Sequence, residues 1–167
     1  MSKAFVAILM GSDSDLPILQ NAFDELKSLN ISFEARILSA HRTPGAVAEY
    51  VQSADKRGCA VFIAAAGLAA HLAGAVAANT IKPVIGIPID AGSLGGLDSL
   101  LSTVQMPGGT PVACTTIGKA GAKNAALIAA QILAITDNQI AERLQHMREE
   151  KRQALRKADE KLQAEVA

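Results

Sequence analysis

Continuous apolar runs alternate with helical patterns along the first 136 residues. A short apolar run that ends at a glycine or a polar loop is typical of a strand buried on both faces, whereas apolar residues three and four apart predict a helix. The pattern predicts one α/β domain over residues 1–136, with a five-stranded parallel sheet and helices on both faces. The expected strands are 4–10, 31–38, 60–66, 83–88 and 112–117, and the helices between and after them begin near 16, 44, 72, 97 and 119.

The segment 137–167 has a different pattern. Charges of both signs are interspersed around a narrow apolar stripe, which indicates a solvated helix rather than a nucleic-acid tail. We expect a charged helical extension that packs along this stripe on the same or a neighbouring subunit. A coiled coil is the alternative, although Lys151 interrupts its seam. The stripe consists of Ile140, Leu144, Met147, Leu155, Ala158 and Leu162.

The loop after the second predicted strand, residues 39–44, has the sequence SAHRTP. Pro44 suits the first position of a helix, and Thr43 is then the expected N-cap. His41 and Arg42 would therefore lie beside the free N–H groups and the positive end of a helix dipole. This arrangement predicts an anion site with a side chain that can transfer a proton near neutral pH. An exposed surface loop without a function is the alternative.

Two further loops carry candidate functional side chains. Residues 11–15, GSDSD, offer hydroxyls for a phosphate and carboxylates for ribose hydroxyls, or simply cap the next helix with Asp15 as the N-cap. His71 follows the third strand, either as part of a site or as a structural residue. Ligands bind at the carboxyl ends of strands in open α/β sheets, so all these loops can face one crevice.

Composition and motifs exclude several classes of protein. Half of the residues are apolar and the net charge is zero, which argues against a nucleic-acid surface and against disorder. No apolar run approaches the roughly 18 residues that span a membrane. Cys59 and Cys114 lack metal-ligand spacing and are expected as reduced thiols in a cytoplasmic protein. The scattered histidines suggest no metal site, and Rossmann, P-loop and nucleophile-elbow motifs are missing.

Five motifs occur in an order and spacing that resemble the 5-(carboxyamino)imidazole ribonucleotide mutase family of bacterial purine biosynthesis. They are MGSDSD at 10–15, SAHRTP at 39–44, AAHL at 69–72, QMPGGTPV at 105–112 and IGKAGAKNAA at 117–126. The resemblance covers about residues 4–145. It implies a flavodoxin-like three-layer fold, a cytoplasmic homo-octamer, a ribonucleotide substrate, and neither a metal nor an organic cofactor.

The resemblance also implies roles for particular residues. A carboxyl group moves within one nucleotide, from the exocyclic nitrogen of the imidazole to a ring carbon, with His41 as general acid and base. The residues that would bind the substrate are Ser12, Asp15, Ser39, Arg42, Gly67, Ala70 and His71, of which the last three would line a carboxylate pocket.

Two alternatives remain beside the mutase. A related carboxylase branch, which uses aminoimidazole ribonucleotide and carbon dioxide, has lysine in place of Arg42 and lacks AAHL. A non-catalytic nucleotide-binding module on the same fold is the other. The chain departs from the family pattern at Leu68, where glycine is expected, and at Ala73, where proline is usual. We expect Leu68 to narrow the carboxylate pocket and Ala73 to loosen the His71 loop.

Overall fold

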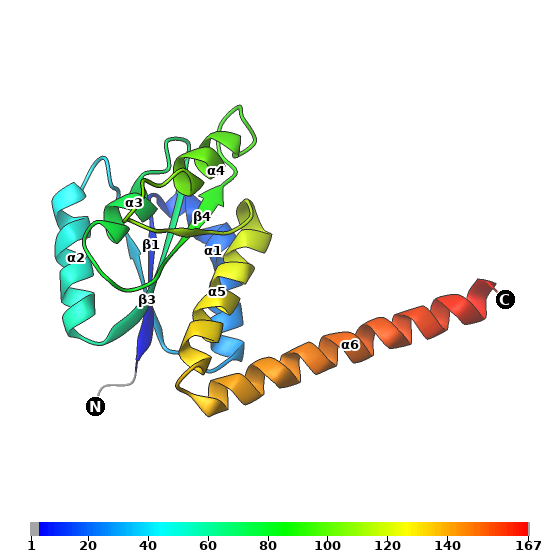
Figure 1. Ribbon diagram of the computed structural model, residues 1–167. Coiled ribbons are helices and arrows are strands. Elements are labelled where there is room, and N and C mark those ends of the chain that lie inside the picture. Colours follow the sequence, from blue (N-terminus) through cyan, green and yellow to red (C-terminus); the bar gives the residue numbers. More distant parts are fainter. Residues whose placement is uncertain (1–3, 167) are drawn as a thin grey trace.

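The computed structural model describes residues 4–166 and contains a five-stranded sheet between layers of helices (Figure 1). All the strands pair in parallel, in the order β2-β1-β3-β4-β5. This is the flavodoxin-like strand order, so the predicted fold is confirmed. The strands are β1 (Phe5–Met10), β2 (Phe33–Ile37), β3 (Cys59–Gly67), β4 (Val84–Ile89) and β5 (Ala113–Cys114).

Alternate side chains of β1 enter two separate cores, one on each face of the sheet. Val6, Ile8 and Met10 pack in the core that contains residues of α1 (Leu16–Ser28) and α5 (Gly118–Ala134). Phe5, Ala7 and Leu9 belong to the core that contains residues of α2 (Pro44–Lys56) and α3 (Leu72–Ala77). Burial on both faces explains why the strand reads as a continuous apolar run.

The fifth strand is shorter than the predicted 112–117. Its ladder with β4 contains only Ala113 and Cys114, although Thr115 N–H still donates to the Gly86 carbonyl at 3.0 Å. After this bond the chain turns into α5, whose first turn lies so close to it that a Cβ on Gly121 would be 1.7 Å from the carbonyl oxygen of Thr116.

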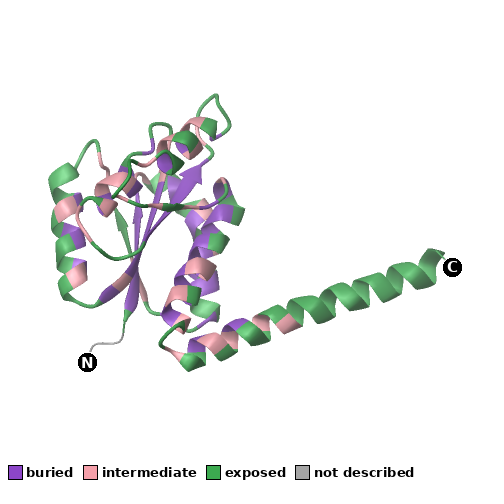
Figure 2. Ribbon diagram, in the orientation of Figure 1, coloured by how far each residue is buried: buried purple, intermediate pink, exposed green. Residues whose placement is uncertain are grey.

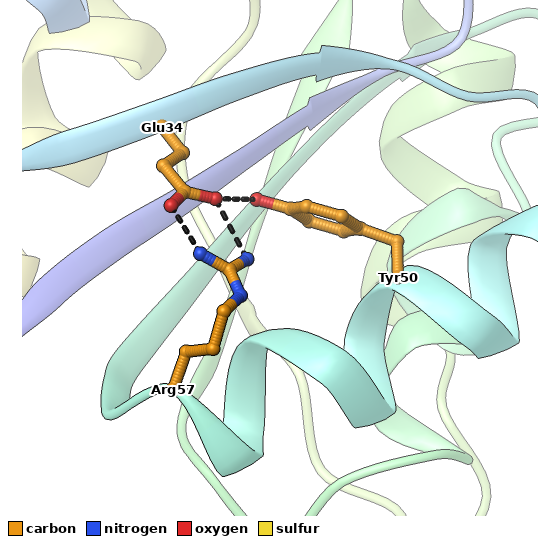
Figure 3. Close-up of polar contacts among 3 residues, drawn as sticks. All are labelled: Glu34, Tyr50 and Arg57. Carbon is orange, nitrogen blue, oxygen red and sulfur yellow. Dashed lines mark hydrogen bonds and ion pairs between the residues drawn. The ribbon is translucent and has the colours of Figure 1, made fainter.

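A polar cluster ties the edge strand β2 to α2 (Figure 3). The carboxylate of Glu34 accepts a hydrogen bond from the Tyr50 hydroxyl at 3.0 Å and a bidentate pair from Arg57, with one bond of 2.8 Å. Arg57 lowers the pKa of Glu34, whereas burial is the main cause that raises the pKa of Tyr50. These contacts hold α2 beside β2, and so support the loop 38–43 that joins them.

The last helix, α6 (Asn138–Val166), leaves the domain as a projecting rod (Figure 1). Ile140 and Leu144 are buried, and Met147 packs against the same core. Beyond residue 150 the helix is exposed throughout, including Leu155 at 72% and Leu162 at 56% (Figure 2). Only the first part of the predicted stripe thus docks within the chain. No helix within residues 4–166 is both long and apolar enough to cross a bilayer.

Candidate active site

A cavity of about 450 Å³ opens at the carboxyl ends of β1 and β3. These strands flank the position where the strand order reverses, which is where ligands bind in this class of sheet. Residues of the segments 11–15, 40–42 and 66–72 line the cavity together with Ala91, but Asp13 and the buried Ala70 do not. A hollow of similar size, about 490 Å³, lies at the opposite end of the sheet around residues 30–32 and 136–140. We place the site in the cavity at the ends of β1 and β3, because its lining contains two histidines and an arginine.

The structure brings His41 and His71 into direct contact. His41 Nε2 lies 2.7 Å from His71 Nδ1, and the two rings meet edge to face with centroids 4.8 Å apart. A hydrogen bond at this distance requires a proton on one of the facing nitrogens and a lone pair on the other. The pair can therefore hold and exchange a proton at the cavity, and the expected convergence of these two loops is confirmed.

Arg42 connects the loop after β2 to the loop after β1. Its Nη2 donates to the Gly11 carbonyl at 3.0 Å, and its backbone N–H donates to the Ser39 hydroxyl at 3.2 Å. Ser39 itself does not line the histidine cavity. It lines an adjoining hollow of about 450 Å³, to which Gly11, Ser12 and Arg42 also contribute. The site therefore has two lobes, with a guanidinium between them.

Ser12 and Asp15 form a reciprocal capping box at the start of the first helical segment. The Ser12 N–H donates to Asp15 Oδ2 at 3.1 Å, and the Ser14 N–H donates to Ser12 Oγ at 3.3 Å. Asp15 does stand directly before α1, as predicted, but its side chain makes no capping bond to that helix. A short 3₁₀ turn, Asp13–Asp15, precedes α1 and gives the capping role to Ser12.

Thr43 also differs in detail from the prediction. It occupies the N-cap position before Pro44, but its hydroxyl does not cap α2. The hydroxyl instead accepts from the Ser39 N–H at 3.0 Å and donates to the Ser39 carbonyl at 3.1 Å. Thr43 thus closes the loop that carries His41 and Arg42. Its side chain makes no hydrogen bond to the first N–H groups of α2.

The loop 67–71 is held from two sides. Gly67 lies so close to the loop between β4 and α4 (Leu97–Val104) that a Cβ on it would be 2.8 Å from the Ala91 Cβ. The N–H of Ala70, which is buried, donates to the hydroxyl of Ser102 at 3.0 Å. Ser102 belongs to α4 and was not among the expected site residues, because nothing in its helical pattern distinguishes it.

A family model described as AIR carboxylase matches residues 5–154. The chain belongs to this family. The N5-carboxyaminoimidazole ribonucleotide mutase of Bacillus subtilis is 51% identical over 96% of this chain and 99% of the relative. The enzyme of the same name from Escherichia coli K12 is 49% identical over 88% of this chain and 87% of its own.

Solved structures agree with this assignment to the AIR carboxylase family. The crystal structure of Treponema denticola PurE superimposes with a TM-score of 0.87 and 32% identity, and covers 96% of this chain and 99% of that chain. The resemblance drawn from the five motifs is thereby confirmed. All the candidate site residues lie within the segment that the AIR carboxylase model matches.

The buried carboxyl of Asp15 makes the stability of the fold depend on pH. Burial raises its pKa from the ordinary value of 3.8, against the opposing hydrogen bonds from Ser12 and Gly11. Above pH 3.8, the unfolded chain loses this proton before the folded chain does, so stability falls as the pH rises until the folded pKa has been passed. The variant Asp15→Asn removes this dependence. As the pH rises from 3.8 to the folded pKa, its unfolding free energy should therefore increase relative to that of the wild type.

Urea unfolding at a series of pH values measures the effect. Asp13→Asn is the matched control, because Asp13 lies in the same turn but is exposed. The difference in unfolding free energy from wild type should increase with pH for Asp15→Asn and stay nearly constant for Asp13→Asn. Parallel profiles for the two variants would contradict a cost of burial at Asp15.

Proposed function

We propose that this protein is an N5-carboxyaminoimidazole ribonucleotide mutase, which converts 5-(carboxyamino)imidazole ribonucleotide into 4-carboxy-5-aminoimidazole ribonucleotide. The observation that carries the proposal is the contact between His41 and His71 at a cavity shared with Arg42, in a chain 51% identical to a mutase over almost its whole length. The carboxylase that uses free carbon dioxide is the second candidate within the family.

The chemistry requires one group that gives a proton and later takes one. Protonation of the exocyclic nitrogen by His41 lets the carbamate C–N bond break, its electrons remain on nitrogen, and carbon dioxide is released into the cavity. The electron-rich ring carbon then attacks carbon dioxide, forms the new C–C bond, and loses its proton to His41. Atoms and protons balance, so neither a second base nor a metal or organic cofactor is needed.

His71 supports this cycle because its Nδ1 faces the Nε2 of His41 at 2.7 Å. The contact can hold the His41 ring in place while its proton resides on the substrate nitrogen, until the ring carbon returns a proton. We infer that His71, with Gly67 and Ala70, forms the pocket for the migrating carboxyl group, since all three belong to the loop beside this contact. Confinement there replaces a bimolecular encounter with free carbon dioxide.

The remaining lobe suits the ribose phosphate. We propose that Arg42 and Ser39, with the hydroxyl of Ser12, hold the phosphate or the carboxylate, since guanidinium and hydroxyl groups match anionic oxygens. The carboxyl group of Asp15 would accept hydrogen bonds from the ribose hydroxyls. Support comes from the position of Gly11, Ser12 and Arg42, which line both lobes and so can contact both ends of one nucleotide.

The reaction is tested by following ultraviolet absorbance with two substrates and without ATP. We expect rapid conversion of 5-(carboxyamino)imidazole ribonucleotide, and little product from aminoimidazole ribonucleotide at modest bicarbonate. The reverse preference would identify the carboxylase and show that Arg42 and His71 do not discriminate between the branches. Binding of nucleotide with turnover of neither substrate would identify a non-catalytic module.

The variant His41→Asn should fold normally and lose turnover by about 10²- to 10⁴-fold, the usual range for removal of a general acid or base. The loss should appear in kcat rather than in KM, because the amide preserves size but cannot carry the proton. His146→Asn on exposed α6 is the control and should behave as wild type. Activity close to wild type in His41→Asn would exclude His41 from proton transfer.

We infer that the protein forms a homo-octamer in the cytoplasm. Exposed apolar residues on α6, such as Leu155, and on α4, such as Leu97 and Leu101, support contacts between copies of the chain. Cys59 and Cys114 are both free thiols, in keeping with a reducing compartment. In this arrangement the outer half of α6 packs along its apolar stripe on a neighbouring subunit.

Replacement of Leu155 and Leu162 by glutamate should therefore reduce the mass of the assembly without unfolding the domain, because both side chains point outward in one chain. The matched control is Gln153→Glu with Ala164→Glu, which adds the same charge to the opposite face of the helix. Light scattering after gel filtration measures the mass. Equal masses for the two double variants would contradict packing through this stripe.

A further inference from the structure

Leu68 has an unusual backbone conformation at the edge of the cavity. Its φ is +55°, and among the non-glycine residues described only Asn30 shares a positive φ. Asparagine tolerates this left-handed region, whereas a leucine there crowds its own carbonyl oxygen. Strain of this kind persists only where the surroundings impose it, and it is concentrated at functional sites. The position therefore invites a functional explanation.

Helix α4 provides the support that holds this conformation. Ser99, which is completely buried, fixes α4 to the end of β4 through its Oγ, 2.8 Å from the Ile89 carbonyl oxygen. One turn later the Ser102 hydroxyl accepts the N–H of Ala70 at 3.0 Å and lies 3.4 Å from the carbonyl oxygen of Leu68. The Ser102 hydroxyl donates at 2.7 Å to the Asp98 carbonyl, so the Ala70 N–H is the group that attaches this segment to the fixed helix.

The side chain of Leu68 crosses from this loop to the next one. A Cβ built on Gly92 would lie 2.6 Å from Leu68 Cδ2, so the leucine occupies the space that glycine leaves open there. Leu68 lines the same cavity as His71, and yet 55% of its surface is exposed. Leu68 is thus a large, partly exposed apolar side chain that spans two loops. It forms a wall of the cavity rather than part of the core.

We propose that Leu68 is the wall that retains carbon dioxide beside His41 and His71 between the two steps of the reaction. The inference rests on the proposed mutase function and gives a specificity role to Leu68, which was expected only to narrow the carboxylate pocket. Carbon dioxide is small and uncharged, so an apolar side chain that closes the gap between the loops at 67–71 and 90–96 hinders its escape. Escape leaves the C–N bond broken and the C–C bond unformed, with aminoimidazole ribonucleotide as the by-product.

The test measures how the intermediate divides between product and escape. Wild type and the variants Leu68→Ala, Leu68→Gly and Leu68→Met convert 5-(carboxyamino)imidazole ribonucleotide, and both 4-carboxy-5-aminoimidazole ribonucleotide and aminoimidazole ribonucleotide are quantified by chromatography. The decarboxylation that occurs without enzyme is subtracted. We expect the ratio of by-product to product to rise severalfold in Leu68→Ala and Leu68→Gly, and to stay near wild type in Leu68→Met.

The series separates the side chain from the strain. Leu68→Gly removes both the wall and the strain, whereas Leu68→Ala removes the wall and keeps a Cβ in the left-handed region. If the ratio of by-product to product rises in Leu68→Gly alone, the proposed role of the Leu68 side chain is wrong, and the effect comes from greater mobility of the loop. Equal ratios in all four proteins would also overturn it. A wild type that forms no product would instead refute the mutase function, so the two failures are distinguishable.

Discussion

The parallel pairing of β1 with β3, buried on both faces of the sheet, is the constraint on which the site depends. Met10 lies opposite Ala65, and the Gly11 N–H still donates to the Ala65 carbonyl at 3.2 Å, whereas β3 continues to Gly67 along β4. The strand order reverses here, since β2 lies beyond β1 and β4 beyond β3. The loops that follow β1 and β3 therefore separate to opposite sides and leave a cavity between them. Because the core on each face requires this register, the position of the cavity is as stable as the fold.

Single polar contacts then bring the loops into working positions. Arg42 donates to the Gly11 carbonyl, Thr43 closes its own loop onto Ser39, and Ser102 holds the N–H of Ala70. Each such bond contributes only about 0.5–1.5 kcal/mol to stability. None of them determines the fold, but together they place His41 against His71. Stability thus comes mainly from the sheet and its two cores, and alignment of the reactive groups from a few hydrogen bonds within and between the loops.

The sequence predicted the features that depend on local pattern. Continuous apolar runs identified the buried strands, and Pro44 marked the start of α2. The sequence did not predict the short β5, because the pattern at 112–117 does not show that only Ala113 and Cys114 pair with β4. The sequence also did not predict that Ser12 caps the turn with Asp15 or that Ser102 holds the N–H of Ala70. Several hydroxyls stood at suitable spacings, and tertiary packing selected among them.

Two features that lower the stability of the fold lie where the proposed chemistry occurs. Burial disfavours the ionised carboxyl group of Asp15, and Leu68 adopts a left-handed backbone. Elsewhere the chain uses small residues to pack closely, as where a Cβ on Gly86 would lie 2.4 Å from Thr103 Cγ2. The same packing fixes α4, and a fixed α4 allows Ser102 to hold the N–H of Ala70, two residues after the strained Leu68.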